Sequence, residues 1–192
     1  TRTGLAISYW QMGTIHILEG FDHLLFLLTL LLIVNGIWPL LKTVTAFTLA
    51  HSLTLALATL DLVHIPPAPT EAVISLSIML LAVEVVRKNQ GEFTLSERFP
   101  WLVAFTFGLV HGLGFAGALS EIGVPQNDIP LTLVMFNVGV ETGQVMFVVA
   151  VSLLLAGLHR IHNHSALTLA RATPYVIGGV AAFWTIERTV GS

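Results

Sequence analysis

The chain has 192 residues, of which 55% are hydrophobic and 10% charged, and its mean hydropathy is +0.85. Because soluble domains usually carry about a quarter charged residues, this composition excludes an ordinary soluble protein. The formal net charge of −3 gives no reason to expect nucleic acid as a partner. No cysteine is present, which excludes disulfides and thiolate metal sites. A bound metal ion would need nitrogen and oxygen ligands, and the eight histidines are the first candidates.

The apolar residues come in long runs, which predict an all-α, polytopic membrane helix bundle of about six transmembrane helices, each taking roughly 20 residues. Residues 1–12 predict an interfacial stretch anchored by Tyr9 and Trp10. We expect the chain to form a single domain, 1–192, with spans near residues 14–34, 40–60, 71–86, 101–119, 131–158 and 174–186.

The distribution of basic residues predicts how this bundle is oriented in the membrane. Six of the eight fall on one side of the predicted bundle: Lys42 at the start of the second span, Arg87, Lys88 and Arg98 after the third, and Arg160 and Arg171 after the fifth. The loops after the second and fourth spans carry no Lys or Arg. The positive-inside rule therefore predicts that both termini are extracytoplasmic, with Arg188 as the exception. The sequence begins at Thr1 and not at Met, which is compatible with removal of a signal peptide and does not decide it.

The orientation can be tested with single cysteines, because the chain has none of its own. We expect a cysteine placed within 87–98 to react with a membrane-impermeant reagent only from the cytoplasmic side. A cysteine within 61–66, a predicted outer loop, is the control and should react in intact cells. Labelling of the 87–98 position from outside intact cells would overturn the orientation.

Ionisable side chains within the first predicted span are the next feature. Such a residue costs several kcal/mol in a membrane unless it is paired, hydrated or coordinated, so each one marks a candidate functional site. The span contains His16, Glu19, Asp22 and His23. On a continuous helix, His16, Glu19 and His23 fall within a sector of about 60°. Asp22 points about a quarter-turn away, where it could orient a histidine.

Other spans place polar residues at a similar depth. His51 and His111 lie about halfway along their spans, and Asn137, Glu141 and Gln144 share one face at spacings i, i+4 and i+7. A single buried histidine more often makes a hydrogen bond between helices than it binds a metal. Convergence from four helices, between the midplane and the outer leaflet, instead predicts one shared metal or proton site.

Glycines accompany these polar residues. Gly13 and Gly20 lie beside the polar stripe of the first span, and Gly108 and Gly112 flank the region of His111. Small residues at such positions let the backbones of neighbouring membrane helices approach closely. We therefore predict helix packing, not chemistry, at these glycines.

Five stretches, in order along the chain, resemble the HupE/UreJ family of bacterial membrane proteins. They are GTIHILEGFDHLLFLLTLLL (13–32), FTLAHSLTLAL (47–57), EAVISLSI (71–78), FGLVHGLGFAGAL (107–119) and FNVGVETGQV (136–145). The resemblance implies a multi-pass protein of the bacterial inner membrane that acts as a nickel or cobalt permease. The first span is also similar to the signature of larger nickel/cobalt permeases, a His, two acids and a His in one helix. Here the spacing is looser by one residue, and a Glu replaces an Asp.

The residues themselves suggest the ligands. Imidazole plus carboxylate, without thiolate, suits Ni²⁺, Co²⁺ or Zn²⁺. The expected nitrogen ligands are His16, His23, His51 and His111, and the expected carboxylate ligands are Asp22 and Glu141, which would offset the charge of a divalent ion. The groups expected to orient these ligands or to guide entry are Glu19, Ser52, Asn137 and Gln144.

Two other functions remain open from the sequence. The first is an intramembrane zinc hydrolase with an outward-facing active site, in which several of these histidines and Asp22 would hold the zinc ion. The second is a proton relay or an assembly partner without bound metal. A chain of 192 residues is small for a transporter, which favours either the hydrolase or a homo-oligomer. For a permease and for a hydrolase alike, the expected partners are metal ions and the lipid bilayer.

Overall fold

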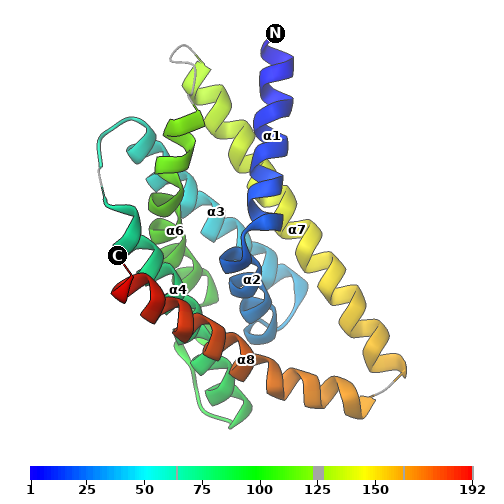
Figure 1. Ribbon diagram of the computed structural model, residues 1–192. Coiled ribbons are helices and arrows are strands. Elements are labelled where there is room, and N and C mark those ends of the chain that lie inside the picture. The colour runs from blue at the N-terminus through cyan, green and yellow to red at the C-terminus, as the bar shows by residue number, and fades with distance from the viewer. Residues whose placement is uncertain (64, 123–127, 162, 192) are drawn as a thin grey trace.

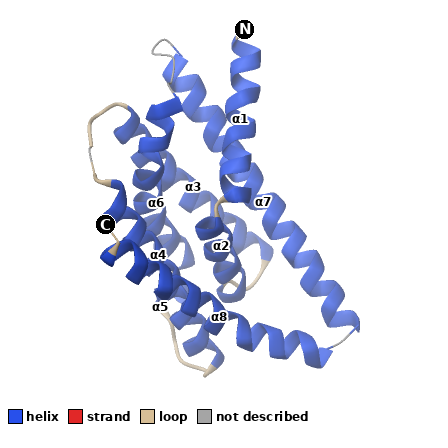
Figure 2. Cartoon of the chain, viewed as in Figure 1, coloured by secondary structure: helices blue, strands red, loops and turns tan. Residues whose placement is uncertain are grey.

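The computed structural model describes residues 1–63, 65–122, 128–161 and 163–191. Throughout these ranges the chain forms helices and no β-strand (Figure 2), which confirms the all-α prediction. The elements in chain order are α1 (Arg2–Glu19), α2 (Phe21–Ile33), α3 (Ile37–Thr59), α4 (Pro67–Asn89), α5 (Leu95–Arg98), α6 (Pro100–Ile122), α7 (Ile129–Ile161) and α8 (Asn163–Val190).

Local sequence explains where several helices begin and end. The Thr1 hydroxyl caps α1 by accepting a hydrogen bond from the Gly4 amide at 3.3 Å. Pro67 opens α4, a position where its missing N–H is no loss. Gly36, before α3, and Gly91, after α4, have φ values of +96° and +83°. Other residues rarely adopt these backbone angles, so both turns depend on glycine.

The first predicted span is broken. A continuous helix is expected over 14–34, but α1 and α2 meet at Gly20, whose φ of −78° and ψ of 94° are extended, and the two axes bend by 71°. Helix α1 also begins at Arg2, within the stretch predicted to be interfacial. The apolar run continues across the break, so hydropathy gives no sign of it. The break places the end of α1 and the start of α2 side by side at one level of the bundle (Figure 1).

Most of the helix packing occurs in three pairs: α3 with α6, α1 with α7, and α4 with α8. Glycines bring the α1–α7 pair together. A Cβ atom on Gly13 would lie 2.0 Å from the carbonyl oxygen of Phe136, and one on Gly139 would lie 2.1 Å from that of Trp10. Neither position can carry a side chain unless the helices separate, which confirms the packing role predicted for Gly13.

The α3–α6 pair is built in the same way. A Cβ atom on Gly108 would lie 2.5 Å from the carbonyl oxygen of Phe47, and one on Gly112 would lie 2.3 Å from that of His51. These contacts confirm that Gly108 and Gly112 serve helix packing. They also fix the height of His51 on α3 against the neighbouring turn of α6.

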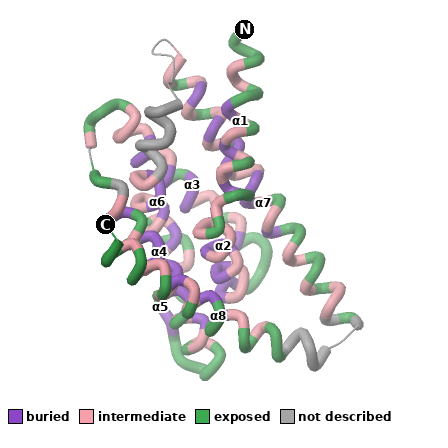
Figure 3. The backbone as a smooth tube through the Cα atoms, viewed as in Figure 1, coloured by how far each residue is buried: buried purple, intermediate pink, exposed green. Residues whose placement is uncertain are grey.

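Helix α2 lies among the three pairs and touches α1, α3, α4, α7 and α8. Buried residues concentrate where these helices meet, with Phe26, Phe47 and Phe136 among the largest fully buried side chains (Figure 3). The C-terminal part of α7 and the N-terminal part of α8 extend away from the other helices (Figure 1). Leu153 and Leu154, in this part of α7, are 69% and 70% exposed, as expected for residues that face lipid.

Three helical segments within the described ranges are long and apolar enough to cross a membrane: Ile37–Thr59, Ala68–Asn89 and Ile129–Leu158. The bent pair α1–α2 qualifies as a fourth if it counts as one broken span. Within the described residues, the apolar stretch of α6, Pro100–Gly114, is shorter than these segments. A membrane protein is thus supported, whereas the count of six spans and the position of the termini stay predictions.

Candidate metal centre

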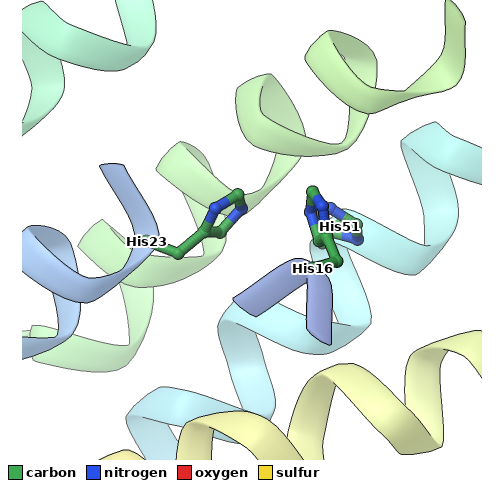
Figure 4. A group of neighbouring side chains, drawn as sticks. All are labelled: His16, His23 and His51. Atoms are coloured by element: carbon green, nitrogen blue, oxygen red, sulfur yellow. The ribbon is translucent and has the colours of Figure 1, made fainter. Parts of the chain in front are cut away.

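Three of the predicted ligands come together at the break between α1 and α2. His16 lies in the last turn of α1, His23 in the first turn of α2, and His51 in the middle of α3. One ring nitrogen of each lies within 4.8 Å of those of the other two (Figure 4). Among the described residues, this histidine trio (His16, His23 and His51) is the one group of three or more His, Cys, Asp or Glu side chains placed so closely.

The spacing is near that of a metal site. Zn²⁺ and similar ions hold imidazole nitrogens at about 2.0–2.1 Å, so three nitrogens on one ion lie about 3.3–3.6 Å apart in tetrahedral or trigonal geometry. The separations in the trio, all within 4.8 Å, exceed this by up to about 1.5 Å. Rotation of the imidazole rings about their side-chain bonds would bring the nitrogens closer, so the residues present fit a divalent transition-metal ion.

Unpaired nitrogens point to a ligand as well. Within the described part of the chain, both ring nitrogens of His23 and of His51 are buried and have no hydrogen-bond partner. His51 is fully buried. A buried polar group left unsatisfied costs about 1–3 kcal/mol, so such groups call for an explanation. A metal ion bound by one nitrogen of each ring would satisfy two of these four atoms.

Gly20 makes room for the trio. A Cβ atom on Gly20 would lie 2.7 Å from Nδ1 of His23 and 2.7 Å from the carbonyl oxygen of His16. The sequence predicts that this glycine lets a neighbouring helix approach. In the structure it instead admits the His23 ring against the end of α1, so a glycine between the two histidines is what allows both to reach the same point.

His111, the fourth predicted nitrogen ligand, lies next to the trio. Its ring centroid is 5.2 Å from that of His23, and its Nε2 is 3.4 Å from the Ser77 hydroxyl. That hydroxyl donates its proton to the Ile74 carbonyl oxygen at 2.6 Å. Ser77 must therefore accept from His111, which puts the imidazole proton on Nε2. Nδ1 of His111, which has no partner among the described residues, then carries a free lone pair.

Asp22 is engaged elsewhere. Its two carboxylate oxygens accept hydrogen bonds from the Arg188 guanidinium at 3.0 and 3.4 Å, which joins the start of α2 to the end of α8. Arg188 also donates to the Glu71 carbonyl oxygen at 3.1 Å and lies 3.8 Å from the Glu71 carboxylate. Asp22 thus adjoins His23 in sequence, but it is not part of the closely spaced group found among the described residues.

The predicted residues of α7 face α3. Glu141 accepts a hydrogen bond from the Thr45 hydroxyl at 2.7 Å, and Gln144 accepts one from Thr48 at 2.8 Å. The Asn137 amide lies against His51 and donates to the Leu133 carbonyl oxygen at 2.7 Å. Glu141 is likewise outside the close group of described residues, whereas Asn137 is well placed to orient His51.

Ser52 and Glu19 are the last two predicted residues of the site. Ser52 donates its hydroxyl to the Thr48 carbonyl oxygen at 2.6 Å, within its own helix. Glu19 is exposed. The sector that groups Glu19 with the histidines assumes a continuous helix, and the break at Gly20 removes that assumption.

Comparison with known families adds to this geometry. The model of a family described as "HupE / UreJ protein" matches residues 1–188, nearly the whole chain. The chain belongs to the HupE/UreJ family. No curated protein and no solved structure shows significant similarity to it. Membership implies a membrane protein that handles transition-metal ions, and it confirms the resemblance inferred from the five sequence stretches.

Two residues of this HupE/UreJ protein gain a role that sequence reasoning misses. Ser77 orients His111, although its stretch, residues 71–78, is among those that resemble the family. Arg188, the exception in the charge distribution, is the partner of Asp22. The isolation of Arg188 from the other basic residues in the predicted topology is the sequence signal that points to a carboxylate partner.

Proposed function

We propose that this protein carries Ni²⁺, or the chemically similar Co²⁺, across the bacterial inner membrane, and that the histidine trio binds the ion in transit. The observation that carries the proposal is the meeting of three histidines from three helices, with unsatisfied nitrogens on His23 and His51. Imidazole ligands suit both ions, and the choice of nickel or cobalt rests on the family.

The broken helix supports transport. Many secondary transporters bind their substrate where a membrane helix is interrupted, since the break lets side chains and helix ends converge at one depth. Here His16 ends α1 and His23 begins α2, on either side of Gly20. The C-terminal end of α1 also brings the negative end of its helix dipole to the site, which favours a cation.

The electrostatics support a site that can release its ion. Neutral imidazoles bind a divalent ion but do not offset its charge. Asp22, which follows the break, is held by Arg188 at 3.0 Å, and Glu141 lies on α7. We propose that His111 joins the trio as a fourth nitrogen ligand and that Asp22, one residue before His23, offsets part of the ion's charge from nearby.

Transport can be measured directly. Purified protein in lipid vesicles that contain a metal-sensitive dye should admit Ni²⁺ with saturable kinetics, in competition with Co²⁺ and not with Mg²⁺, which prefers oxygen ligands. Vesicles without protein and vesicles with His51→Ala should show background entry only. A zinc ion that stays bound in the trio, with no ion entry, would contradict transport and support the hydrolase alternative.

A further inference from the structure

A row of polar side chains leads away from the histidine trio between α3 and α7. His51, Thr48 and Thr45 follow one another at three-residue intervals on α3. Opposite them, Glu141 and Gln144 are neighbours on α7 at spacing i, i+3. The two cross-helix hydrogen bonds, Thr45 to Glu141 at 2.7 Å and Thr48 to Gln144 at 2.8 Å, join the helices along this row.

The row has a direction. Thr45 precedes His51 by six residues, which is about 9 Å along a helix. Gln144 and Thr48 are buried, at 1% and 4% exposure, whereas Glu141 and Thr45 are partly exposed. The row therefore begins at the fully buried His51 and reaches a more accessible carboxylate nearer the N-terminal end of α3.

Glu141 is an unusual residue for this place. It lies inside Ile129–Leu158, one of the apolar segments able to span a membrane. Within the described ranges, no Lys, Arg or His forms an ion pair with Glu141. Its carboxylate accepts a hydrogen bond there from the Thr45 hydroxyl. A carboxylate at such a depth is costly without a cation or a proton, and one hydroxyl does not offset a full charge.

We propose that Glu141, Gln144 and the Thr45 hydroxyl form a second, all-oxygen cation subsite that is separate from the histidine trio. Glu141 provides the charge. The Gln144 carbonyl oxygen has a second lone pair beside the one that accepts from Thr48, and the Thr45 oxygen keeps its lone pairs when it donates to Glu141.

The trio and the proposed subsite differ in their ligand atoms, and therefore in how tightly they would bind an ion on its way through the protein. Imidazole nitrogens bind late first-row divalent ions more tightly than carboxylate and carbonyl oxygens do, and the latter also accept Mg²⁺ and Mn²⁺. An ion held by the trio would thus step to a weaker site before it leaves. This role in the route rests on the proposed function, whereas the existence of the subsite does not.

Cobalt titration of the detergent-purified protein tests the subsite without any transport measurement. Co²⁺ bound by three or four imidazoles in a near-tetrahedral site absorbs visible light much more strongly than Co²⁺ in an oxygen site, so the two are distinguishable. We expect one tight ion with intense absorption and one weaker ion, detected by equilibrium dialysis, with little absorption. Glu141→Gln should weaken the second ion at least about tenfold. The first ion should change by no more than about twofold, as expected for separate sites.

The controls separate the two sites. His51→Ala should abolish the intense absorption and leave the weaker ion in place. Thr142→Val removes a hydroxyl from the next residue of α7, which faces Trp10 of α1, and should change neither ion. Retention of the first ion shows that Glu141→Gln is folded, and if that variant does not fold, Thr45→Val should weaken the second ion several-fold.

Two results would overturn the subsite. If Glu141→Gln weakens the intensely absorbing ion, Glu141 is a ligand of the trio and not of a separate site. If neither ion responds to Glu141→Gln or to Thr45→Val, the row between α3 and α7 only holds the helices together. A failure of Ni²⁺ transport with two intact cobalt sites would count against the proposed function alone.

Discussion

Replacing His23 by alanine should lower the affinity of the purified protein for Ni²⁺ by at least about tenfold, the size expected for loss of a ligand or of a group that orients one. His23 is the member of the trio that also lies beside His111, with ring centroids 5.2 Å apart. Its removal therefore takes one imidazole from the group of four and deprives the other three of a shared neighbour. Equilibrium dialysis with radioactive nickel measures the change.

Phe21→Ala is the matched control for this variant. Phe21 is two residues from His23 on the same helix and is 72% exposed, so its loss should leave Ni²⁺ affinity unchanged. An unaltered affinity and stoichiometry in folded His23→Ala would assign His23 to packing. The unsatisfied nitrogens of His23 would then need a different explanation.

Adding a single methyl group at Gly20 should reduce Ni²⁺ affinity by a similar factor, at least about tenfold, without removing any ligand. In Gly20→Ala the new Cβ would fall 2.7 Å from Nδ1 of His23 and 2.7 Å from the carbonyl oxygen of His16. Contacts this short force the imidazole ring or the end of α1 to move. Either movement separates the histidines, and the same dialysis measurement detects it.

Gly157→Ala provides the control for the glycine variant. A Cβ atom on Gly157 would meet nothing within 4 Å among the described residues. Since alanine also favours a helix by about 1 kcal/mol over glycine, this variant should be at least as stable as the wild type. If Gly20→Ala binds Ni²⁺ like the wild type, the trio does not depend on the close contact at the break.

The positions of the long helices follow largely from the length of the apolar runs. The segment predicted over 40–60 corresponds to α3, Ile37–Thr59, because about 20 apolar residues need a helix to satisfy their backbone in lipid. The break at Gly20 does not follow from such a pattern. Glycine is common within membrane helices, and only its contacts with His16 and His23 distinguish this one.

The sequence predicts the depth of the candidate site's residues in the membrane, but not the direction in which each side chain points. Matching the residues by depth identifies His16, His23 and His51, because depth depends only on the distance along each helix. Which way a side chain points around the axis depends on the tertiary structure. The ion pair of Asp22 with Arg188 joins residues 166 positions apart, so no local spacing could reveal it.

Packing within the three helix pairs is closer than packing between them. His16 belongs to the α1–α7 pair, whose backbones meet at Gly13 and Gly139, and His51 to the α3–α6 pair, which is held at Gly108 and Gly112. One extended residue, Gly20, connects His16 to His23. Under the proposed function, an ion bound to the trio would add a link between these two pairs, which the hydrogen bonds between α3 and α7 already connect. We expect the bound ion to stiffen the junction at Gly20, and its release to make the junction more flexible.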